Sequence, residues 1–175
     1  CKKFALFNEY GPTETTVISI ACLVTPKDTR GTKISIGKPI NNTSVFILGR
    51  HMELLPEGIK GEIYIGGDGL AKGYLNDEMQ TQQKFVSNPF VPGEGLYRSG
   101  DLGRRQPDGN LEFLGRVDSQ VKIRGFRVEL GEIEIQLAAF DGVKKCVVLA
   151  KEKDDNKFIV PYYISDEEIA AATLK

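Results

Sequence analysis

The chain has 175 residues, 41% hydrophobic and 27% charged, which is the composition of an ordinary globular protein with one domain or two small ones. Its formal net charge of -1 gives no electrostatic reason to expect a nucleic acid or an acidic membrane surface as partner. No apolar run is long enough to cross a bilayer, and the first residues do not resemble a signal peptide, so we expect a cytoplasmic protein.

Cysteine and histidine usage argues against two kinds of site. Cys1, Cys22 and Cys146 are scattered without metal-ligand spacing, and we interpret them as reduced thiols of a cytosolic protein. The single histidine, His51, follows Gly49 in a predicted turn, where we expect a solvated side chain. One histidine in the sequence gives neither a multi-histidine metal site nor the expectation of a Ser-His-Asp triad.

The first predicted element is a short helix that is capped by the threonines at 13–15 and runs through Ala21. Nineteen glycines, many of them between short β-rich runs, then predict many turns and an antiparallel, barrel-like body. The turn at 106–109 has Pro and Gly where a β-turn requires them, so its flanks should form a hairpin. The predicted strands, rich in branched or aromatic residues, are 44–48, 62–65, 96–98, 111–114 and 120–123.

The character of the chain changes after Asp118. Residues 120–128 indicate a small hairpin around Gly125, and the apolar spacing of Ile133, Leu137 and Phe140 predicts a helix over about 130–140. Residues 146–150 and 158–164 then read as two strands joined by a charged turn. Ser165 followed three residues later by a glutamate is a capping-box pattern, so we expect a helix to begin there and to be cut off by the end of the chain.

The stretch Asn-Glu-Tyr-Gly-Pro-Thr-Glu-Thr-Thr at 8–16 combines groups that suit a nucleotide with a phosphate and a metal ion. Tyr10 offers a face for stacking a base, and the Gly11-Pro12 turn lets the backbone approach a ligand closely. Thr13 can donate to a phosphate oxygen, and Glu14 is the hard oxygen ligand that Mg²⁺ prefers. By itself the motif could equally be a structural turn.

Three further stretches have alternative interpretations when taken singly. Asp101, after a Ser-Gly turn, suits the two hydroxyls of a ribose, but it could be a surface aspartate in a loop. The alternation of Arg, Lys and Val over 115–134 could be a plain amphipathic strand. The glycine-rich run 66–73 lacks the Gly-Lys-Ser/Thr ending of a P-loop, and we interpret it as mainly a turn.

Together these stretches resemble the amino-acid adenylation domains of nonribosomal peptide synthetases, in the superfamily that includes acyl-CoA synthetases and firefly luciferase. The matching runs are 8–14, 61–67 with 73–74, 97–102 and 115–134, in the order and at the spacing of that family. The resemblance implies an α+β, β-rich fold with a distorted antiparallel β-barrel-like region and the edge of an α/β subdomain. It assigns residues 1–117 to the large subdomain and 118–175 to the start of a small, mobile C-terminal lid.

The resemblance also implies an activity. Adenylation domains activate an amino acid with ATP and Mg²⁺, releasing pyrophosphate, and load it onto the phosphopantetheine of a peptidyl carrier protein, beside a condensation domain in the parent synthetase. Antibiotic biosynthesis is the implied setting. An acyl- or aryl-acid CoA ligase remains an alternative within the superfamily, and a β-rich binding module without catalysis is an alternative outside it.

Site roles transfer from the family by motif. Catalysis by in-line displacement at phosphorus relies on positioning and charge neutralisation, which the resemblance assigns to Thr13, Glu14 and Arg116. The implied nucleotide contacts are Tyr10 on adenine, Gly11 in its turn, Thr13 on the α-phosphate, Asp101 on the ribose, Arg116 beside ribose and phosphate, and Arg127 on phosphate or carrier, with Glu14 on Mg²⁺.

The remaining implied roles concern the substrate and the lid. Glu9, Val17 and Ile18 match positions that line the amino-acid pocket, although Glu9 and Arg127 could simply face solvent. Asp118 matches the hinge of the mobile lid, and Gly125 matches the turn that approaches the pantetheine. Ser99 stands where the family usually has threonine.

The family also has groups that this sequence does not contain: a phosphate loop and an amine-binding aspartate before residue 1, and a catalytic lysine after residue 175. We therefore expect the chain to be a piece of a larger enzyme and to be inactive by itself.

Overall fold

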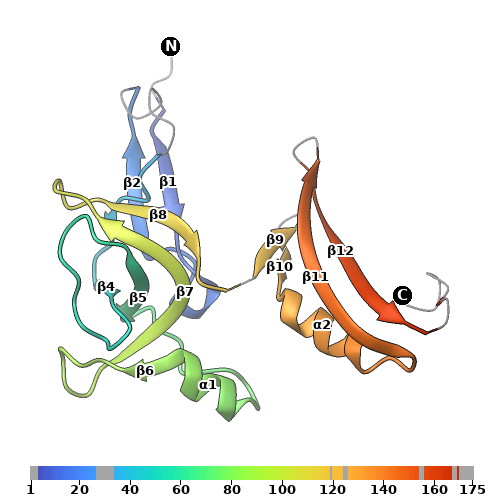
Figure 1. The fold of residues 1–175 in the computed structure, drawn as a ribbon. Helices are drawn as coiled ribbons and strands as arrows, with labels where there is room; N and C mark the ends of the chain where they lie inside the picture. The colour runs from blue at the N-terminus through green and yellow to red at the C-terminus, as the bar shows by residue number, and fades with distance from the viewer. Residues whose placement is uncertain are drawn as a thin grey trace. The chain divides into compact units, whose positions relative to one another are not determined.

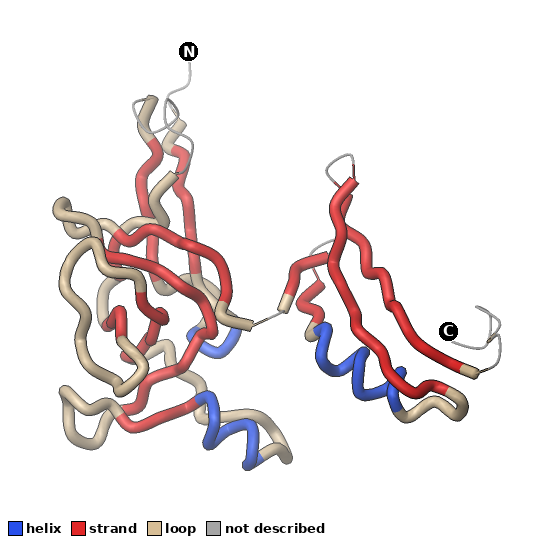
Figure 2. The backbone as a smooth tube through the Cα atoms, viewed as in Figure 1, coloured by secondary structure: helices blue, strands red, loops and turns tan. Residues whose placement is uncertain are grey.

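The computed structural model describes residues 4–26, 34–118, 120–123, 126–153, 156–166 and 169, with only the backbone of Lys122 and Arg127. The chain divides into two compact units, Cys1–Val117 and Asp118–Lys175. Every strand pairing within the described residues is antiparallel, and strands predominate in Figures 1 and 2. The prediction of a β-rich, antiparallel α+β fold is confirmed. None of the helices in this part of the chain is long and apolar enough to span a membrane.

The first unit contains a small sheet that holds the opening motif. Its strands lie in the order β1-β2-β3, with β1 at Leu6–Tyr10, β2 at Ile20–Val24 and β3 at Lys38–Pro39. Tyr10 pairs with Ile20, so the residues between them form the loop that joins β1 to β2. This arrangement explains how a nine-residue motif is held in one place.

The larger sheet of the first unit has five strands in the order β4-β5-β7-β6, with β8 paired to β7. The strands are strongly curved, as the prediction of a barrel-like region requires (Figure 1). The turn predicted at 106–109 joins β7 to β8, and Gly109 N donates to the Gln106 carbonyl at 2.9 Å. The bounds are β4 Thr43–Leu48, β5 Gly61–Gly67, β6 Phe85–Ser87, β7 Gly95–Arg105 and β8 Leu111–Arg116.

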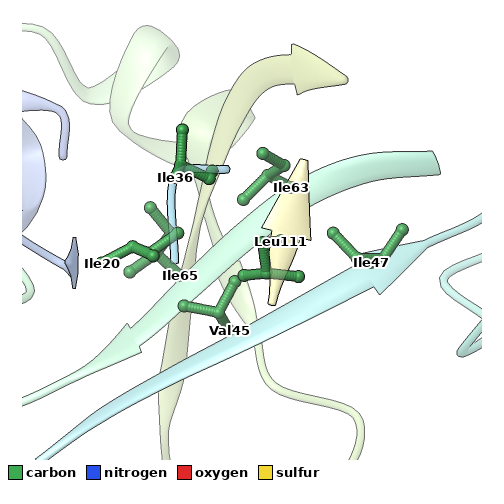
Figure 3. Packing of buried hydrophobic residues seen from close by; sticks show 7 residues of the cluster. All are labelled: Ile20, Ile36, Val45, Ile47, Ile63, Ile65 and Leu111. Atoms are coloured by element: carbon green, nitrogen blue, oxygen red, sulfur yellow. The ribbon is translucent and has the colours of Figure 1, made fainter. Parts of the chain in front are cut away.

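The core of this unit lies between the two sheets. Alternation along β5 puts Ile63 and Ile65, both fully buried, on the face that packs against Ile20 of the small sheet (Figure 3). Burial of each such side chain contributes about 1.5–3 kcal/mol. Gly37 pairs with Leu111 in an isolated bridge and ties the segment before β3 to β8. The whole cluster is Ile20, Ile36, Val45, Ile47, Ile63, Ile65 and Leu111.

The second unit packs a helix on a long hairpin. Among the described residues of this unit, Leu130 and Leu137 of the helix and Val148 of the hairpin are the buried apolar residues. The expected helix is confirmed, and Ile133 and Leu137 of the expected stripe pack in this cluster, but Phe140 lies beyond the end of the helix at Ala138. The two predicted strands are present and extend further than their apolar cores. The elements are β9 Val121–Ile123, β10 Phe126–Val128, α2 Leu130–Ala138, β11 Val143–Lys153 and β12 Asn156–Ser165.

Of the predicted helices, one is wrong and one falls on residues that the structure does not describe. The helix through Ala21 is wrong, because the helical turn η1 spans only Thr13–Thr15 and the chain continues as strand β2. Thr16 and Val17 adopt positive φ, which ends the helical turn at once. The helix expected from Ser165 falls on positions 167, 168 and 170–175, outside the described residues. Helix α1, Glu78–Lys84, was not predicted.

Candidate functional site

The opening motif forms the end of β1 and a tight loop. Asn8 to Tyr10 belong to the strand, and η1 follows Pro12 directly. Thr16 and Val17 have φ of 59° and 68°, a left-handed conformation that costs a β-branched residue of the order of 1–3 kcal/mol. Hydrogen bonds hold the loop in this shape, with Ser19 N donating to the Tyr10 carbonyl at 2.9 Å. The motif is therefore a fixed loop in this structure.

Gly11 lies where this loop touches itself. A Cβ at this position would stand 2.4 Å from the Val17 carbonyl oxygen and 2.8 Å from Ser19 N. Both are backbone atoms, so they cannot rotate away as a side chain could. The absence of a side chain at Gly11 is thus required by the chain's own backbone, whatever ligand approaches from outside.

Glu14 is only 6% exposed, although it is a carboxylate on a short helical turn. The Tyr74 hydroxyl donates to its Oε1 at 2.6 Å, and burial, followed by this hydrogen bond, raises the pKa of Tyr74 well above its ordinary value. Ala71 N donates to the Glu14 carbonyl at 2.9 Å, and the Thr16 hydroxyl donates to the Gly69 carbonyl at 2.8 Å. The glycine-rich segment thus contacts the opening loop at several points.

Tyr10, Asp101 and Arg116 meet directly. The Tyr10 hydroxyl donates to Asp101 Oδ2, and Arg116 Nη1 donates to Asp101 Oδ1 at 2.6 Å. Asp101 is 8% exposed, so this charge-assisted pair is largely shielded from water. Burial, and then the negative charge of Asp101, raise the pKa of Tyr10 well above its ordinary value. The three residues come from β1, β7 and β8, three strands of two sheets.

Irregular strand pairing orients Asp101. On one side, the register of β7 against β5 shifts between Glu62 and Tyr64; on the other, its register against β8 shifts after Leu102. Gly100 has a φ of 75°, which an L side chain rarely adopts. Bulges of this kind bend a strand and re-aim its side chains. Asp101 therefore lies in a strand but is turned by a bulge toward Tyr10.

The other predicted site residues are distributed as follows. Thr13 is exposed on η1, close in sequence to Glu14; Glu9 is exposed on β1, opposite Ala21. Val17 is 71% exposed, and Ile18 is half-buried beside it. Asp118 is exposed, and its Oδ1 accepts a hydrogen bond from Gln120 N at 3.2 Å. Gly125 lies outside the described residues, and Arg127 is described only as backbone in β10, opposite Lys122.

Sequence reasoning missed residues that support this site. Tyr74 was recognised as part of a matching run, but its contact with Glu14 has no sequence signal because sixty residues separate the two. The sequence identifies Ser99 only as part of the Ser-Gly turn before Asp101 and as standing where the family usually has threonine. Its hydroxyl donates to the Ile63 carbonyl at 2.6 Å and accepts from Asp101 N at 3.0 Å. A hydroxyl two residues before a site carboxylate is the one hint that the sequence offered.

A divalent cation finds few protein ligands here. Among the described residues, no three His, Cys, Asp or Glu side chains lie close enough together to hold a metal ion. Mg²⁺ is usually bound by one or two carboxylates with substrate phosphates and water completing its shell. Glu14, a buried carboxylate held by Tyr74, fits that limited role.

The chain is similar to large peptide synthetases over nearly all of its length. Residues 1–75 match the family described as AMP-binding enzyme. Bacitracin synthase 3 of Bacillus licheniformis is 47% identical over 174 residues, which are 97% of this chain and 3% of that protein. The chain is thus similar to members of the AMP-binding enzyme family. Gramicidin S synthase 2 of Brevibacillus brevis is 46% identical over 176 residues, 100% of this chain and 4% of that protein.

Solved structures of this family agree. A nonribosomal peptide synthetase protein containing adenylation and PCP domains, PA1221, is similar with a TM-score of 0.85 and 34% identity, over 97% of this chain and 35% of that chain. A four-domain nonribosomal peptide synthetase bound to AMP and glycine is 43% identical over 98% of this chain, with a TM-score of 0.60. The resemblance to adenylation domains is confirmed. The chain spans only 3–4% of the first curated relatives and about a third of PA1221.

Proposed function

We propose that the protein containing this chain activates an amino acid with ATP as an aminoacyl adenylate and transfers it to the phosphopantetheine thiol of a carrier domain. This chain supplies one wall of the nucleotide site. The observation that carries the proposal is the carboxylate of Asp101, held between the phenol of Tyr10 and the guanidinium of Arg116. All three came from motifs that the family uses for the nucleotide.

Asp101 is suited to a ribose. Each carboxylate oxygen accepts more than one hydrogen bond, so the two hydroxyls of a ribose can bind while Arg116 keeps its position. Arg116 is the positive charge nearest to Asp101, at 2.6 Å, and it would support the ribose and the adjoining phosphate. The ring of Tyr10, half-buried at the end of β1, would contact the adenine.

The loop after Tyr10 is suited to the triphosphate. Thr13 exposes a hydroxyl that can donate to an α-phosphate oxygen, and Glu14 would hold Mg²⁺. Mg²⁺, when bound, neutralises phosphate charge. The substrate carboxylate attacks the α-phosphorus in line, its P–O bond forms as the bond to pyrophosphate breaks, and positioned charges stabilise this transition state.

The remaining assignments concern the amino acid and the second half-reaction. We assign Glu9, Val17 and Ile18 to the amino-acid pocket, and Gly125 and Arg127 to the approach of the carrier and its phosphopantetheine. A condensation domain is the expected further neighbour in the parent. The PCP domain of PA1221 supports a carrier partner for this chain.

Asp118 is proposed as the hinge between the large subdomain, 1–117, and the C-terminal lid, 118–175. The boundary between the two compact units, after Val117, supports this choice. Asp118→Pro in the complete adenylation domain should impair thioester formation more than adenylation, because proline fixes φ at the point where a hinge must change it. Equal losses in both half-reactions would argue against a hinge at Asp118.

The proposal is tested by amino-acid-dependent ATP–pyrophosphate exchange in the complete adenylation domain. Asp101→Ala should raise the KM for ATP about tenfold or more, since it removes a charged partner of the ribose. The control is Asp108→Ala, because Asp108 lies on the exposed β7–β8 turn, where its carboxylate accepts hydrogen bonds from Asn110. The 175-residue chain alone should show no exchange. An unchanged KM for ATP in Asp101→Ala would remove Asp101 from the site.

A further inference from the structure

The strand that carries Asp101 has an unusual pairing with β5. Tyr64 pairs with Arg98 and Glu62 with Leu102, so a single β5 residue, Ile63, faces three residues of β7. These three residues are Ser99, Gly100 and Asp101. Backbone groups inside such a bulge lose their regular ladder partners and must be satisfied in another way. The orientation of Asp101 depends on which groups form hydrogen bonds with the backbone of the bulge.

The side chain of Glu62 supplies one of the missing partners. Its Oε1 accepts a hydrogen bond from Gly100 N at 3.1 Å, inside the bulge. Arg98 Nε donates to the same carboxylate, at 3.0 Å to Oε1 and 3.1 Å to Oε2. The side chain of Glu62 is only 12% exposed, whereas that of Arg98 is 48% exposed. The hydrogen bond from Gly100 is therefore the more shielded of the two interactions.

Gly100 needs this support because of its backbone conformation. Its φ of 75° turns the chain between Ser99 and Asp101, and Val117 N donates to its carbonyl at 2.8 Å. Glu62 thus holds the amide N–H of Gly100, while Val117, directly after the end of β8, holds its carbonyl. Gly100, which precedes Asp101, is therefore held on both sides, and its conformation directs the Asp101 carboxylate.

We propose that Glu62 is a positioning residue of the nucleotide site, which holds the β7 bulge so that Asp101 is aimed at the ribose. The inference rests on the proposed function, because Asp101 matters to the nucleotide only there. Glu62 does not touch the ligand. It acts through Gly100, and a displacement of about 1 Å at a binding group is enough to cost a large factor in rate. Arg98 keeps Glu62 in its rotamer and contributes less, as exposed ion pairs do.

Variants of Glu62 separate this role from simple stabilisation. In the complete adenylation domain, Glu62→Met keeps the length of the side chain but cannot accept the hydrogen bond, and it should raise the KM for ATP about tenfold. Glu62→Gln retains an amide oxygen for Gly100 N and should restore the KM to within about threefold of the wild type. Arg98→Ala leaves Glu62 and Gly100 paired and should behave like Glu62→Gln.

The measurement compares the KM for ATP with the KM for the amino acid in each variant. The KM for ATP should change while the KM for the amino acid stays within about twofold, since the assigned pocket residues lie on β1 and in the loop before β2, away from the β7 bulge. Equal increases in both constants, or no rescue by Glu62→Gln, would overturn the positioning role. If Glu62→Met does not fold, the comparison of Glu62→Gln with Arg98→Ala still decides, because a large ATP effect in Arg98→Ala contradicts the proposal. An unaffected Asp101→Ala would instead refute the proposed function itself.

Discussion

The phenol of Tyr74 donates a 2.6 Å hydrogen bond to Oε1 of Glu14. Tyr74 is itself fixed, because its backbone N–H donates to the Thr81 hydroxyl at 2.8 Å and its ring packs edge-on against Phe85 with centroids 5.6 Å apart. The helix α1 and the strand β6 therefore anchor the residue that holds Glu14. This connection gives the glycine-rich segment before Tyr74 a structural role, since the segment carries Tyr74 to the opening loop.

Tyr74→Phe should destabilise the chain by about 1.5–3 kcal/mol, because it removes the hydrogen bond donated to a buried carboxylate. Equilibrium unfolding in urea would measure the change. The control is Tyr162→Phe, which removes a hydroxyl from a 43% exposed tyrosine on β12 and should cost less than about 0.5 kcal/mol. Equal small effects of the two substitutions would show that Tyr74 does not support Glu14.

The Tyr10 phenol should make stability depend on alkaline pH. Its pKa in the folded chain is raised, by burial first and by the charge of Asp101 second, whereas in the unfolded chain it is about 10. Above pH 10 the unfolded chain loses this proton while the folded chain keeps it, so the contribution is complete below pH 10 and falls as pH rises. Each pH unit above 10 should cost about 1.4 kcal/mol.

Tyr10→Phe should remove that part of the alkaline slope, and unfolding midpoints between pH 8 and pH 11 would reveal it. Tyrosine absorbance gives an independent readout. Near pH 10 in denaturant, the wild type should show more absorbance from ionised tyrosine than Tyr10→Phe. In the folded protein the two absorbances should be equal, because the Tyr10 phenol keeps its proton. A phenol that titrates near pH 10 in the folded chain would contradict the contact with Asp101.

The elements that were predicted correctly are those whose pattern reflects burial. Branched and aromatic residues over 62–65 identified β5, and the apolar spacing that includes Leu137 identified α2; Ile63, Ile65 and Leu137 are indeed buried in their clusters. Helix α1 has no such stripe. Its one apolar residue, Met79, is exposed, no residue of the helix is buried, and the Asp77 side chain caps it by accepting a hydrogen bond from Gln80 N. Such a helix gives periodicity analysis nothing to detect.

The error after Thr15 has a different cause. Ile20–Val24 is an apolar run that fits a helix or a strand, and pairing with β1 decides for the strand. The geometry of the site likewise depends on strand pairing that the local sequence does not determine. Motifs identified Tyr10, Asp101 and Arg116 as members of one site, but the hydrogen bonds among them depend on two bulges. Bulges are set by long-range strand register, which short motifs do not contain.

Ser99 provides a test of the bulge from within β7. Ser99→Ala removes both the donor to the Ile63 carbonyl and the acceptor of Asp101 N, at a cost of about 1–3 kcal/mol at this 2% exposed position. It should also raise the KM for ATP in the complete adenylation domain. Ser99→Thr keeps the hydroxyl and should preserve that KM. A weakened ATP interaction in Ser99→Thr equal to that in Ser99→Ala would show that the hydroxyl is not what orients Asp101.

Gly11→Ala should be strongly destabilising, although alanine adds one methyl group. The new Cβ would stand 2.4 Å from the Val17 carbonyl oxygen and 2.8 Å from Ser19 N, so the loop must move as a whole. Overpacking of this kind costs about 1–3 kcal/mol. The midpoint of urea unfolding measures this loss. The same movement should weaken ATP binding in the complete domain, because Tyr10 directly precedes Gly11 and Thr13 follows it by two residues.

The matched control for this substitution is Gly131→Ala in helix α2. Among the described residues, no atom outside the helix's own backbone and the two chain neighbours lies within 4 Å of the position that its Cβ would take, and alanine is favoured over glycine in a helix by up to about 1 kcal/mol. The same chemical change should therefore stabilise the second unit and destabilise the first. If both variants moved the unfolding midpoint in the same direction, the backbone contact at Gly11 would not be the cause of the loss, and the fixed shape of the opening loop would need another explanation.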